Sequence, residues 1–95
     1  MSLRPSSGVR FAVDRVDGEP GPEVVYRGFV HLPDADLPIV VRAADSGVTA
    51  VVEADPGGAR SRADLERAAA ALVRAVVRAP IAEGRRPPRR IVRWR

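Results

Sequence analysis

The residues best suited to bind a ligand lie at the C-terminal end of the sequence. Six of the sixteen basic residues, all of them arginine, fall within the last eleven positions, which contain no acidic residue. Guanidinium groups bind phosphate in a bidentate manner, and a cluster of them displaces the counterions that condense on a polyphosphate. An indole ring adds a flat surface on which a nucleobase can stack. The candidate polyanion-binding residues are Arg85, Arg86, Arg89, Arg90, Arg93, Trp94 and Arg95.

The rest of the chain has the opposite charge balance. Residues 1–84 carry ten arginines and all twelve acidic residues, a net charge of −2, so the isoelectric point of about 11.2 comes from the last eleven residues. Pro87 and Pro88 favour an extended conformation that holds the two arginine pairs apart. The alternative to a polyanion ligand is that these arginines pair with carboxylates of the same chain. Those carboxylates include Glu53, Asp55, Glu66 and Glu83.

Groups of residues that could catalyse a reaction or hold a metal ion are scarce. His31 is the only histidine, and we expect it at the surface or at a strand edge. Asp34 and Asp36 have the spacing that opens a calcium-binding loop, but the ligands, glycine and glutamate that complete such a loop are missing. The chain has no cysteine, no Gly-x-Ser-x-Gly motif and no phosphate-binding glycine loop. The sequence therefore predicts a non-enzymatic protein with no metal site and no cofactor.

Size and composition are typical of a small soluble domain. The chain has 95 residues, of which 45% are hydrophobic and 29% charged, which is ordinary for a globular protein. No apolar segment approaches the roughly 18 residues that span a bilayer, and no signal-peptide pattern opens the chain. We therefore expect a cytoplasmic protein. The predicted organisation is a flexible leader at 1–8, one α+β domain at 9–84 and an arginine-rich C-terminal segment at 85–95.

Alternation of apolar and polar residues predicts four strands in the first part of the domain. The short connections between them favour antiparallel neighbours, and Gly47 supplies the positive φ that a tight hairpin needs. The sequence therefore predicts a four-stranded antiparallel meander. Its strands are expected at 9–16, 23–32, 39–44 and 48–54.

One long amphipathic helix is predicted after the strands, at 62–79. Ser61 precedes Asp64 by three residues, the spacing of an N-cap. Pro80 ends or kinks the helix, and Gly84 stops any further turn. The expected apolar stripe is formed by Leu65, Ala69, Leu72 and Val76, with Ala68, Val73 and Ala79 beside it and Arg67, Arg74 and Arg78 opposite.

The residues at 91–94 have the composition of a strand, so the segment at 85–95 is either a free basic tail or includes an edge strand. The order of elements predicts the fold class. A meander followed by a helix and a short C-terminal strand gives an α+β two-layer sandwich, with the helix across one face of the sheet.

The second face of the predicted sheet is unusually apolar. A meander with one wet face normally alternates more cleanly, so we expect something to cover this face. The alternatives are the segment at 91–94, a second copy of the chain or a larger protein; otherwise the valines are scattered surface residues. The candidate interface residues are Val25, Phe29, His31 and Val40.

Two functional hypotheses follow. The first is a non-enzymatic module that binds nucleic acid or another polyanion through the arginine-rich segment, without sequence preference. The alternative is a protein–protein interaction module, a homodimer or an adaptor, that uses the apolar second face or an edge of the sheet. A membrane surface is not an expected partner, because Pro87 and Pro88 prevent a continuous amphipathic helix.

Overall fold

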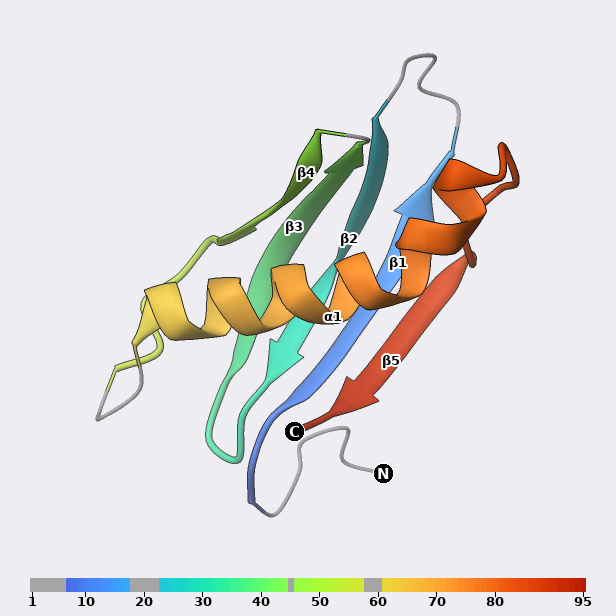
Figure 1. Cartoon of the computed structure of the whole chain (residues 1–95). Coiled ribbons are helices and arrows are strands. Elements are labelled where there is room, and N and C mark those ends of the chain that lie inside the picture. The colour runs from blue at the N-terminus through green and yellow to red at the C-terminus, as the bar shows by residue number, and fades with distance from the viewer. Residues whose placement is uncertain (1–6, 18–22, 45, 58–60) are drawn as a thin grey trace.

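A computed structural model of the chain describes residues 7–17, 23–44, 46–57 and 61–95. It contains one sheet and one helix, in the order strand, strand, strand, strand, helix, strand (Figure 1). The elements are β1 (Arg10–Val16), β2 (Val24–His31), β3 (Asp36–Ala44), β4 (Gly47–Val52), α1 (Arg62–Ala82) and β5 (Arg90–Trp94). The predicted α+β fold class is confirmed.

The sheet has five antiparallel strands in the order β4-β3-β2-β1-β5. The first four form the predicted meander. The last strand returns from the far end of α1 and pairs with the outer side of β1, so the chain's first and last strands lie side by side (Figure 1). The segment at 91–94 therefore extends the sheet at its edge and does not cover the second face, which corrects one of the expectations for that face.

The region between β2 and β3 differs from the expected turn at 33–38, because β3 begins at Asp36. Leu37 and Ile39 both point into the core, which continues the period-two pattern through Pro38. The Pro38 carbonyl accepts a hydrogen bond from the Glu53 N–H (2.8 Å), just beyond the end of β4. The backbone of Pro38 therefore faces the end of β4, and its missing N–H removes no hydrogen bond between β3 and β2.

Helix α1 crosses one face of the sheet diagonally (Figure 1). The Ser61 hydroxyl accepts from the Asp64 N–H (3.3 Å), as an N-cap should. Pro80 lies within the helix, which continues to Ala82 before Gly84 adopts a positive φ of 69°. The fully buried positions are Leu65, Ala69, Val73 and Val77.

The buried helical stripe is thus rotated slightly from the predicted one. Leu72 and Val76 are only partly buried and Ala79 is exposed, whereas Val77, which the prediction omitted, is buried. The buried residues recur every four positions, and residues with this spacing form a row that is inclined to the helix axis. Because α1 crosses the sheet diagonally, this inclined row is the one that packs against it.

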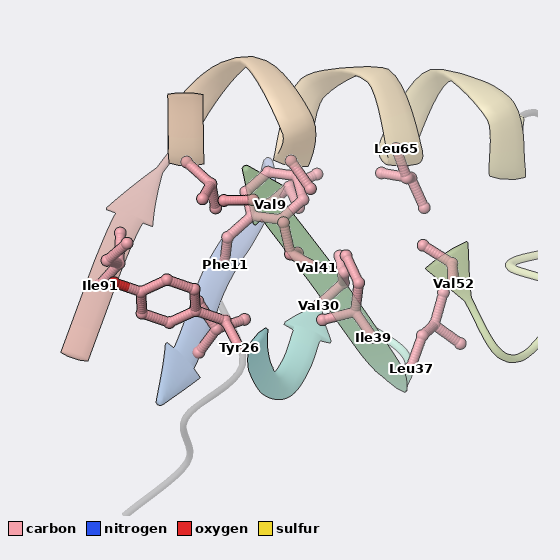
Figure 2. Packing of buried hydrophobic residues seen from close by; sticks show 14 of the residues in the cluster. Val9, Phe11, Tyr26, Val30, Leu37, Ile39, Val41, Val52, Leu65 and Ile91 are labelled. Atoms are coloured by element: carbon pink, nitrogen blue, oxygen red, sulfur yellow. The ribbon is translucent and has the colours of Figure 1, made fainter. Parts of the chain in front are cut away.

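The core lies between α1 and the sheet, and its side chains come from all five strands as well as the helix (Figure 2). Tyr26, Val30 and Val41 are completely buried at its centre. Ile91 of β5 is also buried, with 3% of its surface exposed. Because the last strand contributes a buried side chain, it is part of the hydrophobic core.

The link between α1 and β5 is fixed to the rest of the protein by side chains from β1 and β2. The Tyr26 hydroxyl reaches across β1 to donate to the Pro88 carbonyl (2.6 Å), and Arg15 Nη1 donates to the Pro87 carbonyl (2.5 Å). The Pro87 side chain is itself buried. The arginine-rich segment is therefore attached to the fold, and of the two alternatives for 85–95 the structure has the one that includes an edge strand.

Three sequence predictions fall wholly or partly outside the described residues. They concern positions 1–6 of the expected leader, positions 18–22 between the first two expected strands, and Asp45 in the predicted hairpin. Gly47, within the same hairpin, has the predicted positive φ, at 144°.

Candidate nucleic-acid interface

The predicted arginines are arranged along one border of the sheet, formed by β5 and the link before it. We call this border the basic edge. Strand pairing places Arg90 and Trp94 on the face of the sheet opposite α1 and Arg93 on the helix side. All members are exposed. The basic edge consists of Arg85, Arg86, Arg89, Arg90, Arg93, Trp94 and Arg95.

Few carboxylates neutralise the basic edge. Arg85 forms an ion pair with Glu83 (2.5 Å), and Arg90 lies 3.8 Å from Asp14, with both side chains more than half exposed. The other four arginines form no ion pair with a carboxylate of the described residues. Exposed ion pairs contribute little, so even the two that form leave their arginines available to a stronger anion.

The charges of the basic edge also act on Asp17, which directly follows β1. Its hydrogen bond from Arg15 Nε (2.7 Å) lowers the pKa of the Asp17 carboxyl, and the nearby charges of Arg86 and Arg89 lower it further. The same hydrogen bond raises the pKa of Arg15. Asp17 thus remains ionised and keeps Arg15 oriented towards the Pro87 carbonyl, which holds the start of the basic edge in place.

The face of the sheet opposite α1, called the open face, carries no helix or strand among the described parts of the chain (Figure 1). Three large hydrophobic side chains are exposed on it: Phe29 at 46%, Val51 at 56% and Trp94 at 62%. The open face contains Arg10, Ala12, Asp14, Val16, Val25, Arg27, Phe29, His31, Asp36, Pro38, Val40, Arg42, Thr49, Val51, Glu53, Arg90, Val92 and Trp94.

One row of this face crosses four strands. Strand register aligns Asp36, His31, Arg10 and Trp94 side by side on β3, β2, β1 and β5. Asp36 Oδ1 lies 2.7 Å from His31 Nδ1, and the Arg10 guanidinium carbon lies 5.5 Å from the centre of the Trp94 ring. Arg10 is 8% exposed, and its Nη1 has no hydrogen-bond partner. The row runs along one end of the open face and reaches the basic edge at Trp94.

His31 corrects an expectation from the sequence. It is buried, with 6% of its surface exposed, and does not lie at the surface or at a strand edge. The cause is its position on β2, a central strand, between the Phe29 ring, which stacks on it at 5.9 Å, and Arg10 on β1. Its imidazole therefore serves to support the Phe29 ring and to bind Asp36.

The other candidate interface residues do share the open face. Val25 and Val40 are partly buried there, and Phe29 is exposed. From β3 to β5 this face forms a shallow hollow of about 400 Å³, lined by both charged and apolar residues. The hollow is lined by Arg10, Ala12, Asp14, Arg27, Gly28, Phe29, His31, Pro38, Ile39, Val40, Glu53 and Arg90.

The described part of the chain contains no cluster of three histidine or carboxylate side chains able to hold a metal ion. None of its helices combines the length and apolarity needed to cross a membrane. No protein-family model, curated protein or solved structure matches this chain.

Sequence reasoning missed the contribution of three residues on the interior strands. Arg10, Arg27 and Asp14 lie near the basic edge only because β5 pairs with β1. Their alternation with buried residues marks them as facing away from the core, and this signal was present in the sequence. The alternation does not indicate which strand pairs with the outer side of β1, because that pairing joins residues about 80 positions apart.

Proposed function

We propose that this protein is a non-enzymatic module that binds nucleic acid without sequence preference, through the basic edge. The observation that carries the proposal is the ordered display of six arginines along one border of the sheet, four of them without an ion pair to a described carboxylate. Ordering of the backbone matters because the arginines are already arranged along one edge, so less backbone entropy is lost when they bind phosphate.

The electrostatics favour phosphate over other anions. Several positive charges along one strand match the repeated charges of a polyphosphate backbone, and each contact releases condensed counterions. The weak pair between Arg90 and Asp14 can exchange its carboxylate for a phosphate at little cost, because both groups are already exposed to water.

The decisive experiment measures how salt affects binding to a labelled oligonucleotide. If the five arginines other than Arg85 contact phosphates, the slope of log K against log salt is about −3.5 on a single strand. The double variant Arg89→Gln/Arg93→Gln should reduce the magnitude of that slope by about 1.4. Substitution is preferable to truncation here, because the truncated chain would lose the buried Ile91.

The matched control is Arg74→Gln/Arg78→Gln. It removes the same charge from exposed positions on α1 that lie beside β3 and β4, at the border of the sheet opposite the basic edge. This variant should keep the wild-type slope. Equal losses in both double variants would show attraction to net charge and would refute a defined basic edge, while no binding at about 50 mM salt would refute nucleic-acid binding altogether.

A further inference from the structure

Resting on the proposed function, we infer that the nucleic acid is single-stranded and that its bases stack on Trp94 and Phe29 on the open face. The basic edge alone would accept any polyphosphate. The two exposed rings beside it are what select unpaired bases, because base–aromatic stacking requires a base face that no neighbour already covers.

Both rings are supported from one side and exposed elsewhere. Trp94 has the Arg10 guanidinium over one ring face, yet 62% of its surface is exposed. Phe29 stacks on His31 with an angle of 25° between the rings, and 46% of its surface is exposed. A ring held by a neighbour is already positioned for stacking, so a base gains contact area at little cost in side-chain entropy.

Arg10 strengthens the support beneath Trp94. Its guanidinium is buried, and its Nη1 makes no hydrogen bond within the described structure. A buried guanidinium nitrogen without a hydrogen-bond acceptor favours an acceptor or a negative charge nearby. A phosphate bound near Trp94 would therefore be attracted by Arg10 as well as by the exposed arginines of β5.

The spacing of the rings does not suit a duplex. Trp94 and Phe29 lie two strands apart, with β1 between them, and one row apart along the strands. Standard sheet dimensions place their Cα atoms about 12 Å from each other. Bases in a duplex are paired and stacked on one another, so their faces are not free to meet such separated rings. A flexible single strand can present two unstacked bases at this distance.

Charge complementarity favours the β1–β5 side of the open face for the phosphates. Arg27 and Arg90 line the hollow, which extends from β3 to β5. Asp14 lies between these two arginines in its row, so two cations flank one carboxylate on this side. Glu53 lines the hollow from its β3–β4 side, and Asp36 lies on β3, so negative charge is concentrated on that side.

Trp94 provides a direct test, since it is the only tryptophan in the chain. Oligo-dT and oligo-U should quench its fluorescence on binding, because the bases stack on the indole. A duplex of equal length and a polyphosphate without bases should bind through the basic edge without comparable quenching. Single strands should also bind more tightly than the duplex at equal salt.

Substitution of Phe29 provides a second, independent measurement. Phe29→Leu should weaken binding of oligo-dT by about 5- to 150-fold, the loss of one stacked base, and leave the salt slope unchanged. Val51→Ala is the matched control, because Val51 is equally exposed on this face but lies on β4, at the far edge. It should bind as the wild type does.

The outcomes separate this inference from the proposed function. Equal affinity for single strands, duplex and polyphosphate, with no quenching of Trp94, would overturn the inference and leave binding at the basic edge intact. Failure to bind any of these probes would overturn both. A dimer in light scattering that Phe29→Glu converts to a monomer would show that a second copy covers the open face, and would overturn the inference as well.

Discussion

Replacing Ile91 with alanine should destabilise the whole protein, although the residue lies only four positions before the last residue, Arg95. Ile91 is 3% exposed and belongs to the core that α1 covers (Figure 2). Removing three buried carbon atoms costs about 2.4 kcal/mol in transfer free energy, and the cavity that remains brings the expected loss to about 2–5 kcal/mol. Proteins of 95 residues unfold with about 5–14 kcal/mol, so the loss is a large fraction of the total.

The control is Val92→Ala, one residue further along the same strand. Val92 is only partly buried and faces the open side, so its truncation should cost less than about 1 kcal/mol. Both substitutions lower the strand propensity of β5 in a similar way, and the difference between them therefore reports burial. Urea unfolding followed by circular dichroism, with the m-value checked, measures both free energies. Equal costs, or a loss below about 1 kcal/mol for Ile91→Ala, would show that β5 does not belong to the core.

Three further substitutions test contacts that β1 and β2 make with each other or with the link before β5. Gly28→Ala should lower the unfolding free energy by at least about 1–3 kcal/mol in the same assay, because a Cβ on residue 28 would overlap the Ala12 carbonyl oxygen on β1. A variant as stable as the wild type would refute the close approach of the two strands at this position. The pKa of the Asp17 carboxyl is lowered in the folded state, so its contribution to stability is present above the ordinary pKa of 3.8 and is lost as the pH falls through the lower folded value. Asp17→Asn should therefore reduce the loss of unfolding free energy at acidic pH. The same loss in the variant as in the wild type would contradict the hydrogen bond from Arg15. Burial raises the pKa of Tyr26, so the unfolding free energy of the wild type should fall as the pH rises above about 10. Tyr26→Phe should remove that fall and cost about 1 kcal/mol at neutral pH, because the hydrogen bond to the Pro88 carbonyl is lost. The same fall at alkaline pH in the variant would show that the Tyr26 hydroxyl is not buried.

The local elements of this fold were predictable because their signals are local. Period-two alternation gave the meander strands, with boundary shifts of a few residues, and the 3.6-residue period gave α1. The N-cap at Ser61 and the positive φ of Gly47 follow from side-chain chemistry within a few residues. The clustering of six arginines near the C-terminus was likewise visible without coordinates.

The partner of β5 was not predictable in this way. Both β4 and β1 end the meander with a free edge, and the composition of β5 suits either. Helix α1 has 21 residues and is about 31 Å long, which is enough to carry the chain across a five-stranded sheet about 19 Å wide to the β1 edge. On the β4 edge, the Glu66 carboxylate of α1 accepts a hydrogen bond from the Val52 N–H (2.9 Å), so this backbone donor of β4 is already bound by the helix.

Pairing with β1 is what assembles the candidate site. It places Trp94 over Arg10 and Arg90 near Asp14, and it lets Tyr26 hold the Pro88 carbonyl from two strands away. The amino-acid sequence sets which side chains face away from the core, because alternation is a property of the strand itself. Which of those side chains become neighbours depends on the order of strands in the sheet, and that order results from contacts between distant parts of the chain.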